Sequence, residues 1–174
     1  MEWKIYKYKT KENYDDIFLE SDGKYLTGLW FEGSKYENKH SNKETIYTDL
    51  PIFKETSRWL DIYFSGEEPD FTPKYKLPVL TPFRRQVIDI MLKIPYGKTT
   101  TYGDIAKEIA KNNNISKMSS RAVGSAVGWN PICLIIPCHR VIGSNGNLTG
   151  YGGGLNNKIE LLKEEGISLD KKEK

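Results

Sequence analysis

The fold of the second half of the chain is decided by the stretch Thr101-Tyr102-Gly103-Asp104-Ile105-Ala106-Lys107-Glu108-Ile109-Ala110. Its apolar side chains recur at helical spacing among charged ones, which predicts a short amphipathic helix. After a polar loop over residues 111–117, a second short helix is expected from Ser119 or Ser120 to about Gly128. Two short helices joined by a polar turn are typical of a helix-turn-helix.

The second of these helices has an unusual composition. In Arg121-Ala122-Val123-Gly124-Ser125-Ala126-Val127-Gly128, nearly every face carries small side chains, so the helix can approach another surface closely. From the residues alone, that surface is either a neighbouring helix or an external partner. Arg121 is likewise either an ordinary surface arginine or a side chain that inserts into a groove or a gap in a base stack.

Two longer helices are expected upstream. Thr81-Pro82 supplies an N-cap and a proline for the first turn of one helix, whose apolar stripe ends before Pro95-Tyr96-Gly97. An earlier helix is predicted from Pro51 to Phe64, where apolar residues again recur at helical spacing, and Gly66 ends it. Between these helices, residues 67–73 are polar and rich in proline, as in a linker.

The first 50 residues indicate an antiparallel sheet. Trp3 to Tyr8 alternates large and polar side chains, and the apolar residues 17–19 and 26–31 flank Ser21-Asp22-Gly23-Lys24, a hairpin signal. Asn38 to Thr45 is polar and lacks periodicity, which predicts a mobile loop. We therefore expect an α+β chain of two domains, residues 1–77 and residues 78–174.

Composition bounds the class of protein. Hydrophobic residues make up 38% of the chain and charged residues 28%, the balance of a globular protein in water. No apolar run reaches the roughly 20 residues that a membrane span needs, and the start of the chain lacks a signal-peptide pattern. We expect a cytoplasmic monomer that does not contact a membrane.

Charge is distributed unevenly along the chain. Residues 1–70 carry 10 Lys/Arg against 15 Asp/Glu, whereas residues 71–150 carry 11 against 3. A basic segment of this kind is either a solvated face or a source of phosphate contacts to nucleic acid. The acidic first part is not expected to contact DNA, so we interpret it as a scaffold.

The residues best suited to chemistry lie in Asn130-Pro131-Ile132-Cys133-Leu134-Ile135-Ile136-Pro137-Cys138-His139-Arg140-Val141-Ile142. The Ile and Leu run between prolines predicts a buried strand or core loop that delivers Cys138 beside His139. A thiol must lose its proton before it attacks, and its ordinary pKa is about 8.5, so basic neighbours favour reactivity. Adjacent residues of an extended chain point to opposite faces, which predicts a bridging water between the two side chains. The alternative is an inert buried cysteine.

A metal site is not expected. A structural zinc ion needs about four Cys or His ligands, and the chain offers only Cys133, Cys138, His40 and His139, with His40 far away in a polar loop. The spacing of the two cysteines also differs from that of a CxxC redox pair.

Several of these motifs together resemble the O6-alkylguanine-DNA alkyltransferase family. The resemblance is carried by Pro137-Cys138-His139-Arg140-Val141-Ile142 after Asn130-Pro131, by Arg121-Ala122-Val123-Gly124, and by Tyr102-Gly103 with Ile105-Ala106. It is close over about residues 78–166, in both order and spacing, and looser in the first part of the chain. A ribonuclease H-like first domain and a winged-helix-like second domain are the folds that it implies.

The function implied by this resemblance is direct reversal of DNA damage. An alkyl group on O6 of guanine, and possibly on O4 of thymine, would move irreversibly to Cys138, without a cofactor and once per molecule. By the family pattern, His139 acts as a base through a water, Glu165 orients that histidine and Asn130 braces the site. Tyr102 would supply a hydroxyl to the departing guanine.

The resemblance also implies how damaged double-stranded DNA is bound. The target nucleotide must leave the helix to reach a buried thiol. Arg121 would fill the vacated stack, while the helix of small residues lies in the minor groove and contacts DNA through Ala122, Gly124 and Ser125, with Tyr102 beside them. A loop whose backbone lines the guanine pocket corresponds to Tyr151, Gly152 and Gly153. Many relatives carry serine in place of Gly152, so we expect an altered tolerance for bulky alkyl groups.

Two other classes of function were weighed. A non-catalytic binder of DNA lesions would use the same scaffold with tryptophan in place of the cysteine, and position 138 is Cys. A cysteine hydrolase would need Cys138 and His139 in direct contact, which their adjacency in the chain disfavours.

Overall fold

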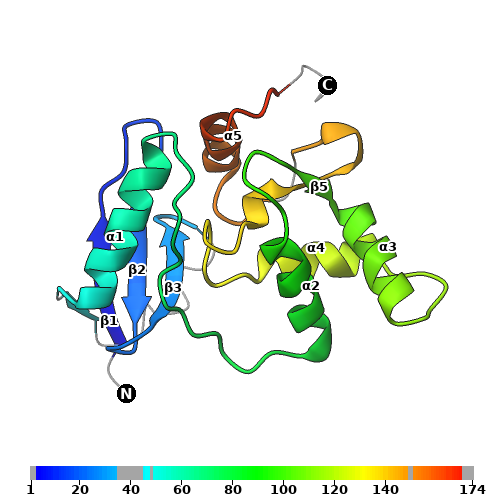
Figure 1. The fold of residues 1–174 in the computed structure, drawn as a ribbon, viewed down its shortest axis with the longest axis horizontal. Coiled ribbons are helices and arrows are strands. Elements are labelled where there is room, and N and C mark those ends of the chain that lie inside the picture. The colour runs from blue at the N-terminus through cyan, green and yellow to red at the C-terminus, as the bar shows by residue number, and fades with distance from the viewer. Residues whose placement is uncertain (1–2, 35–44, 48, 149–150, 170–174) are drawn as a thin grey trace.

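A computed structural model describes residues 3–34, 45–47, 49–148 and 151–169. The protein mixes a small sheet with helices, as expected for an α+β chain. In Figure 1 the sheet and helix α1 occupy one side of the molecule and helices α2, α3 and α4 the other, with α5 between them at the top. One hydrophobic core runs through both sides, from Phe31 and Leu60 to Ile105 and Val123.

The sheet contains the predicted hairpin. Strands β1 (Trp3–Tyr8), β2 (Ile17–Ser21) and β3 (Leu26–Phe31) pair antiparallel, with Tyr6 opposite Leu19 and Leu19 opposite Leu29. The turn between β2 and β3 is closed by the carboxylate of Asp22, which accepts hydrogen bonds from the backbone N–H groups of Lys24 and Tyr25. The alternation seen in the sequence therefore identified three strands.

The sheet also contains a strand that the sequence did not predict. A fourth strand, β4 (Thr45–Tyr47), pairs parallel to β1, so the order is β3-β2-β1-β4 and the sheet is mixed. Its three residues are too few to show a two-residue alternation, and a parallel partner lies far away in the sequence. Of the loop predicted from Asn38 to Thr45, residues 38–44 lie outside the described part, and Thr45 begins β4.

Helix α1 (Pro51–Phe64) has the predicted bounds and packs on β2 and β3. Its buried face carries Phe53, Leu60 and Tyr63, each 0% exposed. The helix ends at Ser65, and Gly66 follows with a φ of 91°, a left-handed conformation that glycine adopts without strain.

Three capped helices form the other side of the molecule. They are α2 (Pro82–Leu92), α3 (Tyr102–Asn112) and α4 (Ser120–Gly128). The side chains of Thr81, Thr101 and Ser119 each accept a hydrogen bond from a backbone N–H of the first turn, which satisfies a donor that the helix leaves unpaired. Helices α3 and α4 pack on each other across the polar turn, as predicted for a helix-turn-helix.

The run between the two prolines is a core loop, one of the two predicted alternatives. Residues 132–139 are all buried. Leu29 of β3 exchanges hydrogen bonds with this loop, donating to the carbonyl of Pro131 and accepting from the N–H of Cys133. Leu134 has a φ of 69°, which turns the chain sharply. The loop therefore fastens the reactive segment to the sheet.

The remaining elements were not all foreseen. A 3₁₀ turn over Cys138–Arg140 leads into β6 (Val141–Ile142), which pairs parallel to β5 (Thr100–Thr101) just before α3. A second 3₁₀ turn covers Ser144–Gly146, and helix α5 (Leu155–Glu164) follows. The two-residue strands β5 and β6 have no signal of their own in the sequence, yet they join the start of α3 to the end of the reactive turn.

Candidate active site

Cys138 begins a tight turn rather than lying in an extended segment. The N–H of Arg140 donates to the carbonyl of Pro137 at 3.0 Å, and the N–H of Cys138 donates to that of Ile136 at 2.8 Å. From the sequence we expected an extended chain at Cys138 and His139, and that expectation was wrong. A 3₁₀ turn has about three residues per turn, so consecutive side chains still point in different directions.

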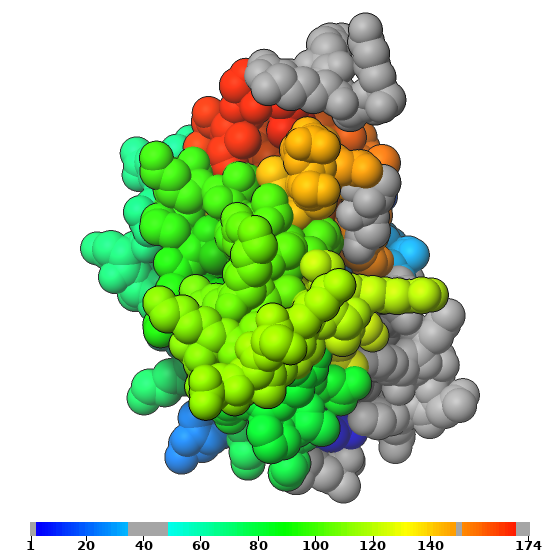
Figure 2. Space-filling view, turned by 90° about the vertical axis from the view of Figure 1, so that its right-hand side faces the viewer, coloured from blue at the N-terminus to red at the C-terminus, as the bar shows by residue number. Residues whose placement is uncertain are grey.

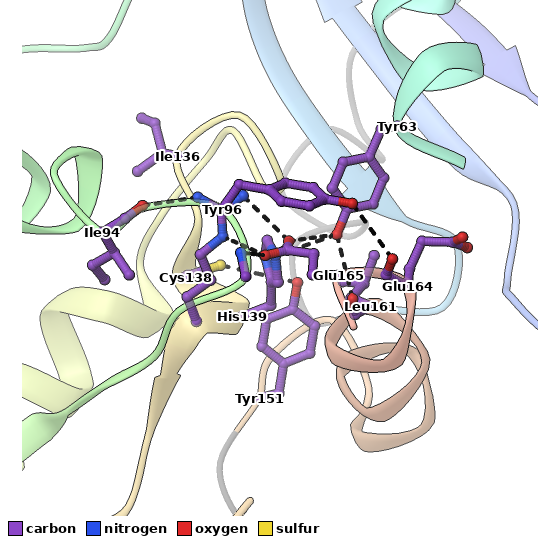
Figure 3. Close-up of polar contacts among 12 residues, drawn as sticks. Tyr63, Ile94, Tyr96, Ile136, Cys138, His139, Tyr151, Leu161, Glu164 and Glu165 are labelled. Carbon is purple, nitrogen blue, oxygen red and sulfur yellow. Dashed lines mark hydrogen bonds and ion pairs between the residues drawn. The ribbon is translucent and has the colours of Figure 1, made fainter. Parts of the chain in front are cut away.

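His139 is directed away from the thiol and toward Glu165 (Figure 3). Its Nε2–H donates to Oε2 of Glu165 at 2.6 Å, and both side chains are fully buried. Nδ1 of His139 is buried and has no hydrogen-bond partner among the described protein atoms. Burial lowers the pKa of His139, although the hydrogen bond and charge of Glu165 oppose that shift. A neutral imidazole with Nε2 protonated leaves Nδ1 free to accept a proton.

Glu165 lies just after α5 and accepts hydrogen bonds from four residues. Arg140 donates Nε to Oε1 at 2.8 Å and Nη2 to Oε2 at 3.2 Å, and the N–H of Gly97 donates to Oε1 at 2.9 Å. Tyr63 donates its hydroxyl to Oε2 at 2.7 Å. Burial raises the pKa of this carboxyl, but the bonds and charges of His139 and Arg140 outweigh it and lower the pKa to about 2. The carboxylate is ionised throughout the physiological range.

The thiol of Cys138 lies among groups that favour its ionised form. A hydrogen bond with Cys133 lowers the pKa of Cys138, burial raises it, and further bonds from Asn130 and Tyr151 with the charge of Lys158 bring it to about 7. The Sγ atom is 3.9 Å from the Tyr151 hydroxyl oxygen. A lowered pKa increases the fraction of Cys138 that is thiolate at neutral pH, which favours a reactive cysteine over an inert one.

Asn130 holds the core loop in shape. Its Nδ2 donates to the carbonyl of Ile136 at 2.7 Å, and its Oδ1 accepts from the N–H of Ile132 at 3.0 Å. Both bonds are buried, where an unpaired polar group is costly. Asn130 thus braces both ends of the loop that delivers Cys138.

A small cavity adjoins the thiol. It has a volume of about 10 Å³, which is about the space that one water molecule needs. A purine cannot enter without movement of the lining. At Gly153 a Cβ would lie 2.7 Å from the Tyr151 ring, so only glycine fits there. The lining residues are Tyr102, Val127, Gly128, Cys133, Cys138, Tyr151, Gly152 and Gly153.

Helix α4 packs on the protein through one face of small side chains and leaves the other face accessible. Val123, Ala126 and Val127 are buried against the protein, and at Gly124 a Cβ would lie 3.7 Å from the Tyr102 ring. The opposite face bears Arg121 and Ser125, which are exposed, and Ala122 and Gly124, which are half-buried. Figure 2 views this side of the molecule, where the green to yellow segments of α2, α3 and α4 form much of the surface.

Lys158 is a site residue that the sequence reasoning missed. It is 0% exposed, its Nζ donates to the carbonyl of Val141 at 2.7 Å, and it lies over the rings of Tyr102 and Tyr151. Burial lowers the pKa of Lys158 to about 8. A signal was present: Lys158 stands three and four residues before Leu161 and Leu162, on the apolar face of α5.

Tyr63, Cys133 and Gly97 were also missed as site residues. In the sequence, Tyr63 is one of several aromatic residues expected in the core, and Cys133 belongs to an apolar run. Nothing in the sequence therefore marks either residue as part of the site. Gly97 contributes a backbone N–H, which any residue would supply. His40, considered above as a zinc ligand, lies outside the described residues.

A thiol of lowered pKa, a buried His–Glu pair and an adjoining helix-turn-helix define a cysteine-dependent protein of the DNA-binding class. The family model described as "6-O-methylguanine DNA methyltransferase, DNA binding domain" matches residues 82–167. The chain is 44% identical to methylated-DNA--protein-cysteine methyltransferase of Methanosarcina acetivorans, over 88% of this chain and 98% of that protein. The protein of the same name from Mycobacterium leprae is 40% identical, with 86% and 85% covered. The chain belongs to the O6-methylguanine-DNA methyltransferase family.

Solved structures agree in fold. The Mycobacterium tuberculosis protein OGT, solved in complex with DNA, superposes with a TM-score of 0.76 at 36% identity, over 93% of this chain and 92% of that one. An O6-methylguanine DNA methyltransferase from Methanococcus jannaschii gives a TM-score of 0.58 at 30% identity, over 94% and 95%. No helix among the described residues is long and apolar enough to cross a membrane.

Proposed function

We propose that Cys138 removes alkyl groups from O6 of guanine in double-stranded DNA and keeps them. The Sγ thiolate attacks the alkyl carbon, a carbon–sulfur bond forms, and the bond between that carbon and O6 breaks. Guanine leaves with the electron pair and takes up a proton. The observation that carries the proposal is that the buried Cys138 thiol lines a cavity together with Tyr102, Tyr151, Gly152 and Gly153. The surroundings that lower its pKa to about 7 support the same conclusion.

His139 is the base in this proposal. Its Nε2 is held by Glu165, so its free Nδ1 is the atom that takes the proton of Cys138, through a bridging water. Glu165 remains ionised and stabilises the imidazolium as it forms. This division of labour is that of a nucleophile, a base and an orienting carboxylate.

Tyr102 assists the departure of guanine. It is the first residue of α3 and lines the cavity beside Cys138. Burial raises the pKa of its hydroxyl, so the group keeps its proton and can donate it to a base that gains charge. Asn130 acts indirectly, because it fixes the loop that carries the thiol.

The exposed face of α4 is the DNA-binding surface in this proposal. Arg121 enters the space that a flipped nucleotide vacates, and Ala122, Gly124 and Ser125 allow close approach to the minor groove. The damaged base enters where Tyr151, Gly152 and Gly153 line the cavity. Because the cavity has a volume of only about 10 Å³, this lining has to move to admit a purine.

The finer architecture also belongs to this proposal. Residues 1–77 form a ribonuclease H-like domain, supported by three antiparallel strands followed by β4 parallel to β1. Residues 78–174 form a winged-helix-like domain, supported by the three capped helices with the small β5–β6 pair. The protein acts as a cytoplasmic monomer and needs no cofactor.

A mass measurement tests the proposed acceptor. The protein is incubated with a duplex that contains O6-methylguanine, and intact and peptide masses are taken. One methyl group on the peptide with Cys138, and none in Cys138→Ser, is the expected result. Binding with both thiols unmodified would instead indicate a lesion binder. A methyl group on Cys133 would show that Cys138 is not the acceptor.

A further inference from the structure

A tyrosine from the first half of the chain reaches into the buried His–Glu pair. The hydroxyl of Tyr63, on α1, donates to Oε2 of Glu165 at 2.7 Å and lies 3.4 Å from Nε2 of His139. That Oε2 atom is the same one to which His139 donates. Figure 3 shows the Tyr63 hydroxyl pointing at this carboxylate from the opposite side to Tyr151. The two donors therefore share one oxygen.

The ring of Tyr63 is held firmly in that position. It is 0% exposed, stacks on Trp59 with ring centroids 5.5 Å apart, and meets Phe64 edge to face at 5.3 Å. Burial, followed by the charge of Glu165, raises the pKa of Tyr63 well above its ordinary value. The hydroxyl thus keeps its proton at every pH at which the protein works and always acts as a donor to Glu165.

We propose that Tyr63 is a positioning residue for alkyl transfer, which acts by sharing the Glu165 oxygen that holds His139. The inference rests on the proposed function and deepens it, because the first half of the chain then contributes to chemistry as well as to folding. The hydroxyl fixes the carboxylate and draws charge from Oε2. It thereby limits how strongly Glu165 favours imidazolium and keeps His139 neutral and ready to accept the proton of Cys138.

The sign of the effect follows from this sharing. Without the hydroxyl, negative charge concentrates on Oε2, protonated His139 becomes more favourable, and its pKa rises. At neutral pH a larger fraction of His139 then already carries a proton and cannot accept one from Cys138. The rate of transfer falls there and recovers at higher pH. The other charged or titratable groups that act on His139 are unchanged: Glu165, Arg140, Lys158 and the adjacent Cys138.

The first experiment measures His139 directly. The chain has two histidines, so ¹⁵N-histidine labelling gives two ring systems, and a His139→Gln sample assigns them. In the wild type, His139 is expected as the Nε2–H tautomer with a low pKa. Tyr63→Phe keeps the ring and removes the hydroxyl, and it should raise the pKa of His139 by about one unit, a tenfold change in proton affinity. An unchanged pKa would overturn the proposal.

Tyr14→Phe is the matched control. Tyr14 is also buried and donates its hydroxyl to a carboxylate of the same region, but to Glu164, at 3.3 Å. Its removal should leave the pKa of His139 as in the wild type. A shift of equal size in both variants would indicate a general loosening of the core and would contradict a specific role for Tyr63.

The second experiment measures single-turnover methyl transfer against pH. Because the pKa of His139 lies below its ordinary value, a rise of about one unit still leaves a sizeable neutral fraction at pH 7. We therefore expect the transfer rate of Tyr63→Phe to fall by only a few-fold at pH 7, with the difference shrinking toward about pH 9. A purely structural defect would lower the rate equally at all pH values. If wild type itself transfers no methyl group to Cys138, the proposed function fails, while the histidine titration still decides the role of Tyr63.

The wild-type protein supplies a measurement that needs no variant. If Tyr63→Phe does not fold, the hydroxyl proton of Tyr63 can be sought by NMR in the native protein. A resonance protected from exchange with water, with a nuclear Overhauser effect to the His139 ring, is expected because the Tyr63 hydroxyl oxygen lies 3.4 Å from Nε2 of His139. Rapid exchange of that proton would overturn the proposal.

Discussion

The buried carboxylate of Glu165 and the outward face of α4 are organised in opposite ways. Around Glu165 both oxygens are filled by donors from Tyr63, Gly97, His139 and Arg140, and the side chain is fully buried. On α4 the side chain of Arg121 is exposed. Enclosure fixes protonation and geometry, whereas exposure leaves a surface free for a partner. Substitutions around Glu165 should therefore alter both stability and the rate of alkyl transfer. Substitutions on the exposed face of α4 should alter only the reaction with DNA.

Replacing Glu165 by Gln should have the largest effect. It leaves the buried guanidinium of Arg140 without its carboxylate, and breaking such a buried pair costs about 3–5 kcal/mol. We expect a lower midpoint of chemical denaturation and slower methyl transfer. Glu164→Gln is the matched control. Glu164 pairs with the half-exposed Lys11, and a glutamine there can still accept the hydrogen bond of Tyr14, so a smaller loss of stability is expected.

Glu165→Gln should also change how the stability of the protein depends on acidic pH. The pKa of Glu165 is about 2 in the folded protein, below its ordinary value of 4.5. A carboxyl with a lowered pKa contributes stability above the unfolded value, and this contribution is lost as pH falls through the folded value. Glu165→Gln should flatten the loss of stability between about pH 4.5 and pH 2. Equal acid dependence in both proteins would contradict the pairing.

Arg121→Ala should separate DNA handling from stability. The side chain is exposed, so the free energy of unfolding should change by less than about 0.5 kcal/mol. Flipping a base costs a few kcal/mol, and loss of the residue that fills the gap should slow transfer from a duplex by roughly 10- to 100-fold. Reaction with the free base O6-benzylguanine, and duplex transfer by Lys163→Ala, should stay at wild-type rates. Equal slowing on duplex and free base would refute this role.

Cys133→Ala should shift the titration of Cys138. A hydrogen bond from Cys133 is the main cause of the Cys138 pKa of about 7, and the thiolate is the reactive form. The rate of alkylation by iodoacetamide should rise through a midpoint near pH 7 in the wild type and through a higher midpoint in Cys133→Ala. Cys133→Ser retains a donor and should restore part of the shift. Coincident pH profiles for all three proteins would exclude the bond.

The smallest expected effect is at the cavity. Gly152 lines it beside Cys138, and Gly152→Ser adds one hydroxyl and removes backbone freedom. We expect the ratio of methyl to benzyl transfer rates to change by a few-fold with little change in stability. The same ratio in both proteins would show that position 152 does not select alkyl size.

Elements with local signals could be predicted from the sequence. The caps at Thr81, Thr101 and Ser119 marked three helix starts, because each is a short polar side chain that satisfies a donor next to it in the chain. Strands β4, β5 and β6 could not be predicted, since strands of two or three residues show no alternation and gain stability only from distant partners. The 3₁₀ turn at Cys138 was likewise hidden by an apolar run that fits an extended chain.

The candidate site divides in the same way. Cys138, His139 and Glu165 were found through motifs that the family shares. Their supporting residues depend on tertiary packing. Tyr63 belongs to another helix, and the position of Lys158 on the apolar face of α5 indicates burial but not which groups it contacts. The electrostatic environment of the thiol therefore follows from the fold rather than from the motif around it.

Arg140 precedes its partner Glu165 by 25 residues, so the parts of the site are synthesised in a fixed order. A ribosome adds roughly 5–20 residues per second, so the growing chain holds its cysteine for a second or longer before the carboxylate exists. Until α5 emerges and docks, His139 has no acceptor and Lys158 is not yet beside the thiol. Reactivity is thus the last property that the nascent chain acquires, and an interrupted translation product carries the cysteine without its activating partners.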